Sequence, residues 1–198
     1  LFEEVQARTK ELTRSVSEMK ALSEVGQAVS SSLDPKIVLG TILSHACDIS
    51  QTGGGAIYVV DPARDVLMLE AGHNMSEALM TAVREHPVGM GDTIVGRCAK
   101  TGEPVQAADI AQIETSHPVY FALRHSGIRA LLAVPLIHQD EAIGVLLVRR
   151  AHAGAFAPQT VSLLQAFANQ SSIAINNARL FREIEDKSRQ LEVASLHK

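Results

Sequence analysis

Residues 130–137 read ALLAVPLI and residues 142–148 read AIGVLLV, and only the four residues 138–141, HQDE, separate them. A connection of four residues is too short for a parallel crossover, so the two segments are predicted to pair as an antiparallel hairpin. Antiparallel strands with one face in water alternate apolar and polar residues, and these segments do not. Both faces of the hairpin must therefore be covered, and helices elsewhere in the chain are the available cover.

Further strands and short helices are predicted on the N-terminal side of this hairpin. Two apolar stretches, 56–60 and 66–71, flank the turn sequence DPARD and predict a second hairpin. Pro135 cannot donate to a strand ladder, so it predicts a bulge or an unpaired edge position. The remaining expectations are short helices at 76–85, 92–100 (capped by Asp92) and 118–125, a short strand at 104–106, a loop at 87–91 and irregular or weakly helical chain at 107–117.

Long helices are predicted at both ends of the chain. Residues 1–33 contain no proline and have apolar residues at mixed spacings of three, four and seven, which suits an amphipathic helix and allows a coiled coil. Asp34 and Pro35 predict the start of a second helix, and one long helix is expected from Pro158 to about residue 195. The apolar positions predicted to form a dimer seam are Leu12, Met19, Leu22, Val29, Leu163, Phe167, Ala174, Phe181, Ile184 and Leu191.

The two ends of the chain resemble each other. Residues 1–12 read LFEEVQARTKEL and residues 180–191 read LFREIEDKSRQL. We interpret this as a repeat, in which the chain starts on the exit helix of a preceding similar domain; the alternative is two amphipathic helices that are alike by chance. The resulting division is an entry helix at 1–33, a core at 34–157 and an exit helix at 158–198 leading to an output domain. Because the chain begins with a leucine, it is expected to be a fragment.

The composition excludes several classes of protein. Hydrophobic residues make up 46% and charged residues 20% of the chain, as in ordinary globular domains. The net charge of -4 argues against a nucleic-acid partner. No apolar run approaches the roughly 18 residues that span a bilayer, so no membrane contact is expected. Cys47 and Cys98 lie in apolar stretches and are expected to be buried free thiols, which fits a cytoplasmic location.

Four groups of residues, in this order, resemble the GAF family. The first is residues 23–34, beginning SEVGQAV, and the second is GMGDTIVG at 89–96 with TGEPV at 101–105. The third is IRALLAVPL at 128–136 with IGVL at 143–146, and the fourth is residues 156–181, ending AINNARLF. The resemblance implies an α+β, profilin-like fold with a six-stranded antiparallel sheet. It also implies that the entry and exit helices lie on one face and form a homodimer bundle. The other face, roofed by residues from about 72 to 129, would hold the pocket for a small-molecule ligand.

The ligand is unknown at this level, but the roof offers candidate residues. The ligand-pocket candidates are Cys98, His117, Tyr120, Phe121, Arg124, His125 and Arg129. For each of them a surface or packing role is the alternative. Arg149 and Arg150, at the end of a strand, could hold an anion, although a solvated rim is the preferred interpretation. Covalent bilin is not expected because residues 116–120, SHPVY, lack the cysteine of bilin-binding relatives, and the cyclic-nucleotide pattern N-K-x-n-F-x-x-x-D-E is missing.

Catalysis by this chain is not expected. Residues 91–98, GDTIVGRC, have arginine and cysteine where a phosphate-binding loop needs lysine and a hydroxyl residue. The histidines show no metal-binding spacing, Cys98 has no roof cysteine for a dithiol cycle, and no nucleophile with a base can be assembled. The chain is therefore predicted to be a sensory relay domain. Residues 194–198, ASLHK, resemble the lead-in to the dimerisation helix of sensor histidine kinases; a diguanylate cyclase, a phosphatase or a ligand-free spacer remain alternatives.

Overall fold

The fold is seen in a computed structural model, which describes residues 4–6, 8–9, 13 and 34–196. One six-stranded antiparallel sheet has the strand order β3-β2-β1-β6-β5-β4. The strands are β1 (Gly54–Asp61), β2 (Val66–His73), β3 (Val88–Gly89), β4 (Val105–Ala107), β5 (Ala130–His138) and β6 (Glu141–Arg150). The predicted α+β class and six-stranded sheet are confirmed.

The hairpin of β5 and β6 lies in the middle of the sheet and is covered on both faces. The two strands pair antiparallel, with Val134 opposite Leu146, and both of these residues are fully buried. A bulge follows Leu136, and β4 pairs with β5 only as far as Ala133, so Pro135 faces no strand on the β4 side. The proline therefore costs the sheet no hydrogen bond there.

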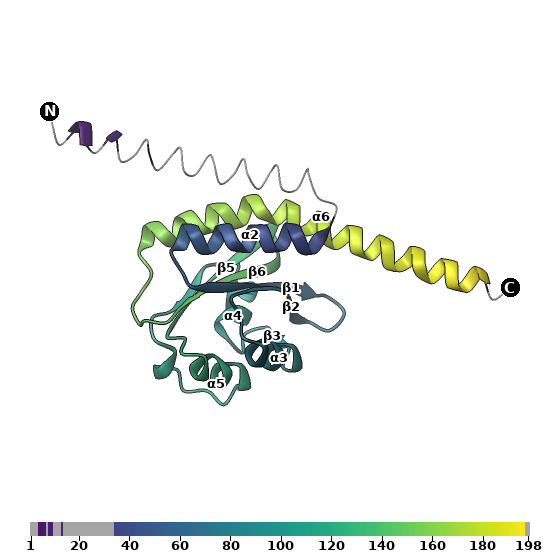
Figure 1. The fold of residues 1–198 in the computed structure, drawn as a ribbon, viewed down its shortest axis with the longest axis horizontal. Helices are drawn as coiled ribbons and strands as arrows, with labels where there is room; N and C mark the ends of the chain where they lie inside the picture. Colours follow the sequence, from purple (N-terminus) through teal and green to yellow (C-terminus); the bar gives the residue numbers. More distant parts are fainter. Residues whose placement is uncertain (1–3, 7, 10–12, 14–33, 197–198) are drawn as a thin grey trace.

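Two long helices, α2 (Pro35–Ser50) and α6 (Pro158–Leu196), cover one face of the sheet (Figure 1). As the sequence predicts, α2 begins after Asp34, whose carboxylate accepts a hydrogen bond from the backbone N–H of Lys36 at 2.9 Å. Alternate strand residues such as Leu132 and Val148 pack into this layer together with Phe167 of α6.

Three short helices, α3 (Glu77–Glu85), α4 (Ile94–Thr101) and α5 (Pro118–His125), form a roof over the opposite face (Figure 1). A 3₁₀ turn, η1 (Ile110–Gln112), precedes α5. The intervening strand residues, Leu131 and Leu147 among them, point into this second core. The unbroken apolar runs of β5 and β6 are thus explained by two cores, one on each side of the sheet.

The roof departs from the expectations in three places. Helix α4 begins at Ile94 rather than residue 92, because Thr93 and not Asp92 is its N-cap: the Thr93 hydroxyl accepts from the N–H of Gly96 at 3.2 Å. The expected loop at 87–91 contains the short strand β3, and the strand expected at 104–106 is shifted to Val105–Ala107. The offsets arise because turn residues only weakly determine where a short element begins and ends.

Most of the predicted entry helix, 1–33, lies outside the described residues. The seam candidates Leu12, Met19, Leu22 and Val29 therefore lie outside them too. Within the residues that are described, no helix combines the length and the apolar character needed to cross a membrane.

Candidate functional site: a pocket at the end of the sheet

The space directly between the sheet and helix α4 is filled by side chains. Tyr58, Cys98 and Tyr120 are all nearly inaccessible to solvent in the core on this side. Burial raises the pKa of Cys98 to about 12, and a hydrogen bond with the backbone of Val105 opposes this only weakly. Cys98 is therefore a protonated packing residue at neutral pH rather than a reactive thiol.

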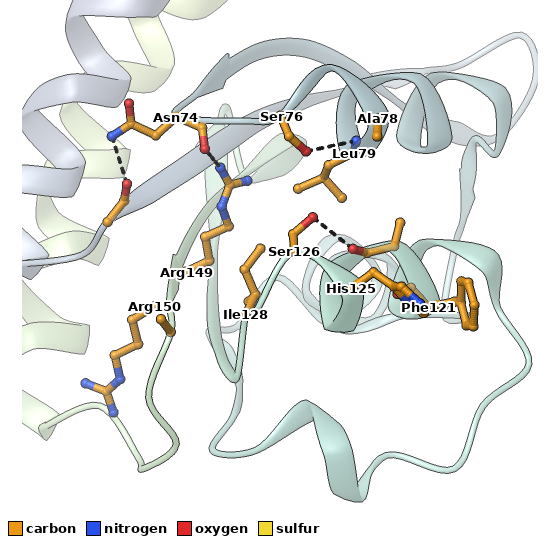
Figure 2. Close-up of a pocket in the computed structure, with 13 residues that line it drawn as sticks. Asn74, Ser76, Ala78, Leu79, Phe121, His125, Ser126, Ile128, Arg149 and Arg150 are labelled. Carbon is orange, nitrogen blue, oxygen red and sulfur yellow. Dashed lines mark hydrogen bonds between the residues drawn. The ribbon is translucent and has the colours of Figure 1, made fainter.

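An open pocket of about 650 Å³ lies beside this filled core, at the end of the sheet between α3 and α5 (Figure 2). It is built where β6 ends, where β1 begins and where the chain passes from β2 into α3. Its lining residues are Gly53, Asn74, Ser76, Ala78, Leu79, Phe121, Ala122, His125, Ser126, Ile128, Arg149, Arg150 and Ala151.

Arg149 is a charged residue that lines the pocket and is itself buried. Only 5% of this residue is exposed, so the expectation of a solvated rim is wrong for Arg149. One terminal nitrogen, Nη2, donates to the carbonyl of His73 at 3.0 Å. The same nitrogen donates to the carbonyl of Asn74 (Figure 2). Burial lowers the pKa of the guanidinium, partly offset by Tyr58 and Cys47, yet an arginine stays charged at neutral pH.

Arg150 follows the alternation of the strand and points to the other side. Its guanidinium donates to the carbonyls of Gly154 and Ala155 and lies over the ring of Phe156, 4.2 Å from the ring centre. Figure 2 shows this side chain turned away from Arg149. Consecutive arginines at the end of β6 therefore have different surroundings, because successive strand residues face opposite sides of a sheet.

Helices α3 and α5 line the pocket with different chemical groups. Helix α3 starts at the pocket, where the hydroxyl of its N-cap Ser76 accepts from the N–H of Leu79 at 3.2 Å. Helix α5 contributes Phe121 and His125, whose ring centres are 4.2 Å apart, and Phe121 is 65% exposed. The pocket thus combines a helix N-terminus, a buried cation and an aromatic wall.

Only two of the predicted ligand-pocket residues, Phe121 and His125, line this pocket. Cys98 and Tyr120 are buried in the roof core. His117 is the N-cap of α5, since its ring accepts from the N–H of Val119 at 3.3 Å.

The two predicted arginines of the roof are engaged in local structure. Arg124 donates to the carbonyls of Ile110 and Ile113. Arg129 forms an ion pair with Asp109, and its hydrogen bonds lower the pKa of that carboxylate. Asn74, Ser76 and Ser126 also line the pocket but were not predicted as pocket residues, because each follows or precedes an element as an ordinary turn or capping residue.

The predicted seam positions on α6 divide into two sets. Phe167 and Ala174 are buried in the core against the sheet, and Leu163 is half-buried. Phe181, Ile184 and Leu191 are exposed, with Ile184 at 65% and Leu191 at 71%. In the described parts of the chain, no group of three or more histidine, cysteine or acidic residues is placed to hold a metal ion.

The sequence matches a family model described as the GAF domain over residues 32–176. The chain therefore belongs to the GAF domain family, whose members are regulatory domains of varied signalling proteins.

Solved structures of similar fold come from proteins with different outputs. The GAF domain of a phosphoenolpyruvate-protein phosphotransferase from Acinetobacter is 19% identical, with a TM-score of 0.67 over 84% of this chain and 97% of that one. A domain of a putative two-component sensor histidine kinase from Sinorhizobium meliloti is 20% identical, with a TM-score of 0.59 over 72% and 90%. Part of a methyl-accepting chemotaxis protein is 21% identical, with a TM-score of 0.61 over 79% and 97%. At these identities the similarity shows the fold alone.

Proposed function

We propose that this GAF domain senses a small molecule and passes the signal through α6 to an output domain of the histidine kinase type, as a homodimer joined by its terminal helices. The domain itself performs no chemistry. The proposal has three parts: a ligand site at the end of the sheet, a mechanical link from that site to α6, and an output that responds to α6.

The observation that carries the proposal is the continuity of α6. This helix runs unbroken for 39 residues. Its first part packs on β5 and α2, where Gln165 donates to the carbonyl of Pro135 at 3.1 Å, and its last part projects beyond the sheet (Figure 1). A rigid helix anchored at one end transmits a small displacement of the sheet over its whole length.

Strand β2 supplies the link between the pocket and α6. At its end, His73 offers its carbonyl to Arg149 in the pocket. Three residues earlier, Glu70 forms an ion pair with Arg182, near the point where α6 leaves the sheet. A ligand that moves Arg149 would therefore act on the strand that holds the exit helix. Coupling between two such sites is typically worth about 1–3 kcal/mol.

The kinase output is supported by two observations. Residues 194–198 resemble the lead-in to a kinase dimerisation helix, and a sensor histidine kinase fragment is among the structures of similar fold. A diguanylate cyclase or phosphatase driven through the same helix is the alternative output.

The test uses the protein at its full natural length. Incubated with labelled ATP, it is expected to form an acid-labile, base-stable phosphohistidine. Arg182→Gln should change the rate of labelling, because it removes the ion pair with Glu70. Arg189→Gln is the control and should leave the rate unchanged, since Arg189 is exposed and lies about two helical turns further along α6. No phosphohistidine would overturn the kinase output, and equal rates in both variants would overturn the relay through β2.

A second candidate, a spacer without ligand, is favoured by the filled roof core. Twenty buried residues occupy the space between the sheet and the roof helices, so a ligand cannot enter there without displacing them. If the domain is a spacer, the output rate is unaffected by any substitution in the pocket between α3 and α5, called the lateral pocket from here on, including Arg149→Met.

A further inference from the structure

We propose that the lateral pocket binds a small organic carboxylate, whose oxygens are held by Arg149 and by the start of helix α3 while its apolar body lies on the α5 side. The inference rests on the proposed sensory function and names the ligand class for it.

The charge of Arg149 has no counter-ion in the described part of the chain. The ion pairs there join Arg64 with Asp61, Arg129 with Asp109, and Arg182 with Glu70. Burial removes most of the hydration of the guanidinium, and the carbonyls of His73 and Asn74 replace only part of it. An anionic ligand in the pocket supplies that missing partner.

Arg149 also retains hydrogen-bonding capacity. Nη2 makes the two bonds to the carbonyls of His73 and Asn74, whereas Nε and Nη1 donate to no acceptor among the described residues. Figure 2 shows the second terminal nitrogen directed toward Leu79 and the pocket. The planar guanidinium presents such free N–H groups as a fork that matches a carboxylate.

A glycine makes room for this arrangement. Gly54 pairs with Arg149 across β1 and β6, and a Cβ on Gly54 would lie 2.8 Å from Nη2 and 2.7 Å from the carbonyl oxygen of His73. The guanidinium therefore lies across the backbone of Gly54, and a larger residue there would displace it.

The charges around the pocket favour the binding of an anionic ligand. None of the thirteen lining residues is acidic, and Glu77, in the first turn of α3, is exposed and outside the lining. The N–H of Leu79 is bonded to Ser76, but those of Glu77 and Ala78 have no acceptor inside the helix, and the N-terminus of a helix favours negative charge. Arg149 and α3 thus converge on the same region of the pocket from two elements.

The rest of the pocket limits the ligand to one anionic group with an apolar body. Leu79 and Ile128 are buried at the back, and the exposed ring of Phe121 lies at the side. Arg150, which would be the second cation, is occupied by carbonyls of residues 154 and 155 and lies over Phe156. One free guanidinium suits a singly charged carboxylate better than a doubly charged phosphate ester.

The test compares binding of benzoate, hexanoate, benzamide and phenyl phosphate to the purified chain by calorimetry and ligand-observed NMR. We expect benzoate or hexanoate to bind, with benzamide and phenyl phosphate weaker by about tenfold or more. Arg149→Met should abolish carboxylate binding, and Arg64→Met, at an exposed arginine outside the lining, should retain it.

A second pair of variants keeps the test valid even if the Arg149→Met variant fails to fold. Ala78 is exposed at the start of α3 and lines the pocket. Ala78→Glu places a carboxylate there and should weaken binding by about tenfold, since it repels the ligand, although it suits the helix N-terminus. Ala78→Gln, of equal size and no charge, should bind as the parent does.

The inference is overturned by no binding of either carboxylate, by equal binding of benzamide, or by equal binding by the Ala78→Glu and Ala78→Gln variants. Tighter binding of phenyl phosphate would assign the pocket to phosphate esters and overturn it as well. If the inference fails while Arg182→Gln still changes the output of the full-length protein, only the ligand class is lost and the relay stands.

Discussion

The phenolic oxygen of Tyr120, in α5, accepts a hydrogen bond from the backbone N–H of Ile94, the first residue of α4, at 3.1 Å. Both residues are almost completely buried. The N–H of a first-turn residue has no partner inside its own helix, so the tyrosine satisfies a donor that would otherwise be orphaned. One side chain therefore fixes the relative position of two roof helices.

Tyr120→Phe is expected to lower the free energy of unfolding by about 1–2 kcal/mol, because it leaves the buried N–H of Ile94 without an acceptor. Urea denaturation followed by circular dichroism measures this. Tyr58→Phe is the matched control: Tyr58 is equally buried, and its hydroxyl bonds to none of the described residues. A loss of the same size in both variants would contradict the role of the hydrogen bond.

Because Cys98 is buried, the free energy of unfolding is expected to fall at alkaline pH. Its pKa rises from 9.0 to about 12 on folding, because burial disfavours the thiolate. A raised pKa in the folded state contributes stability that is fully present below pH 9 and is lost as the pH rises toward 12. Between pH 8 and pH 10 the loss is about 1 kcal/mol.

The measurement compares unfolding of the parent chain and of Cys98→Ala at these two pH values. The variant is less stable throughout, since it leaves a small cavity, but its stability should fall less between pH 8 and pH 10. Other titrating groups, such as Cys47 and Tyr58, whose pKa values burial also raises, affect both proteins alike. An identical pH dependence of the two proteins would refute the assignment to Cys98.

The sheet and its two covered faces could be predicted because they depend on strong, local signals. The runs at 130–137 and 142–148 are too apolar for a half-exposed strand and too close for a crossover, and Pro158 marks the start of a helix that continues to Leu196. The two-residue strand β3 could not be predicted, because its pairing with Val66 and Leu67 is set by the turn around it and not by its own sequence.

The pocket was harder to predict than the fold. Arg149 and Arg150 are identical neighbours in sequence, and only the direction of β6 relative to the roof makes one a buried cation and the other a loop-binding residue. The aromatic wall was predicted through Phe121 and His125, since helix α5 could be placed in the roof. Arg124 and Arg129 were equally reasonable candidates until their carbonyl and carboxylate partners were known.

The ion pair between Glu70 and Arg182 should couple the exit helix to strand β2. Their side chains are 25% and 41% exposed, so solvent screens the pair and its coupling energy is expected to be about 0.5 kcal/mol. A double-mutant cycle with Glu70→Gln and Arg182→Gln measures it, and amide exchange in residues 176–192 should quicken in each single variant. Zero coupling with unchanged exchange would show that the pair does not hold the helix.

The exposed apolar residues of α6 should drive self-association. Ile184 and Leu191 are seven residues apart on one side of the helix, and both are mostly exposed in the single chain. Burying each of these side chains against a second copy would stabilise the dimer by about 1.5–3 kcal/mol relative to the separate chains. Ile184→Gln combined with Leu191→Gln is therefore expected to shift the chain toward monomer in sedimentation equilibrium, while Asp186→Gln, on the opposite side of the same helix, leaves the distribution unchanged. If the parent chain is itself monomeric at all concentrations, these residues serve another contact and the dimer proposal fails.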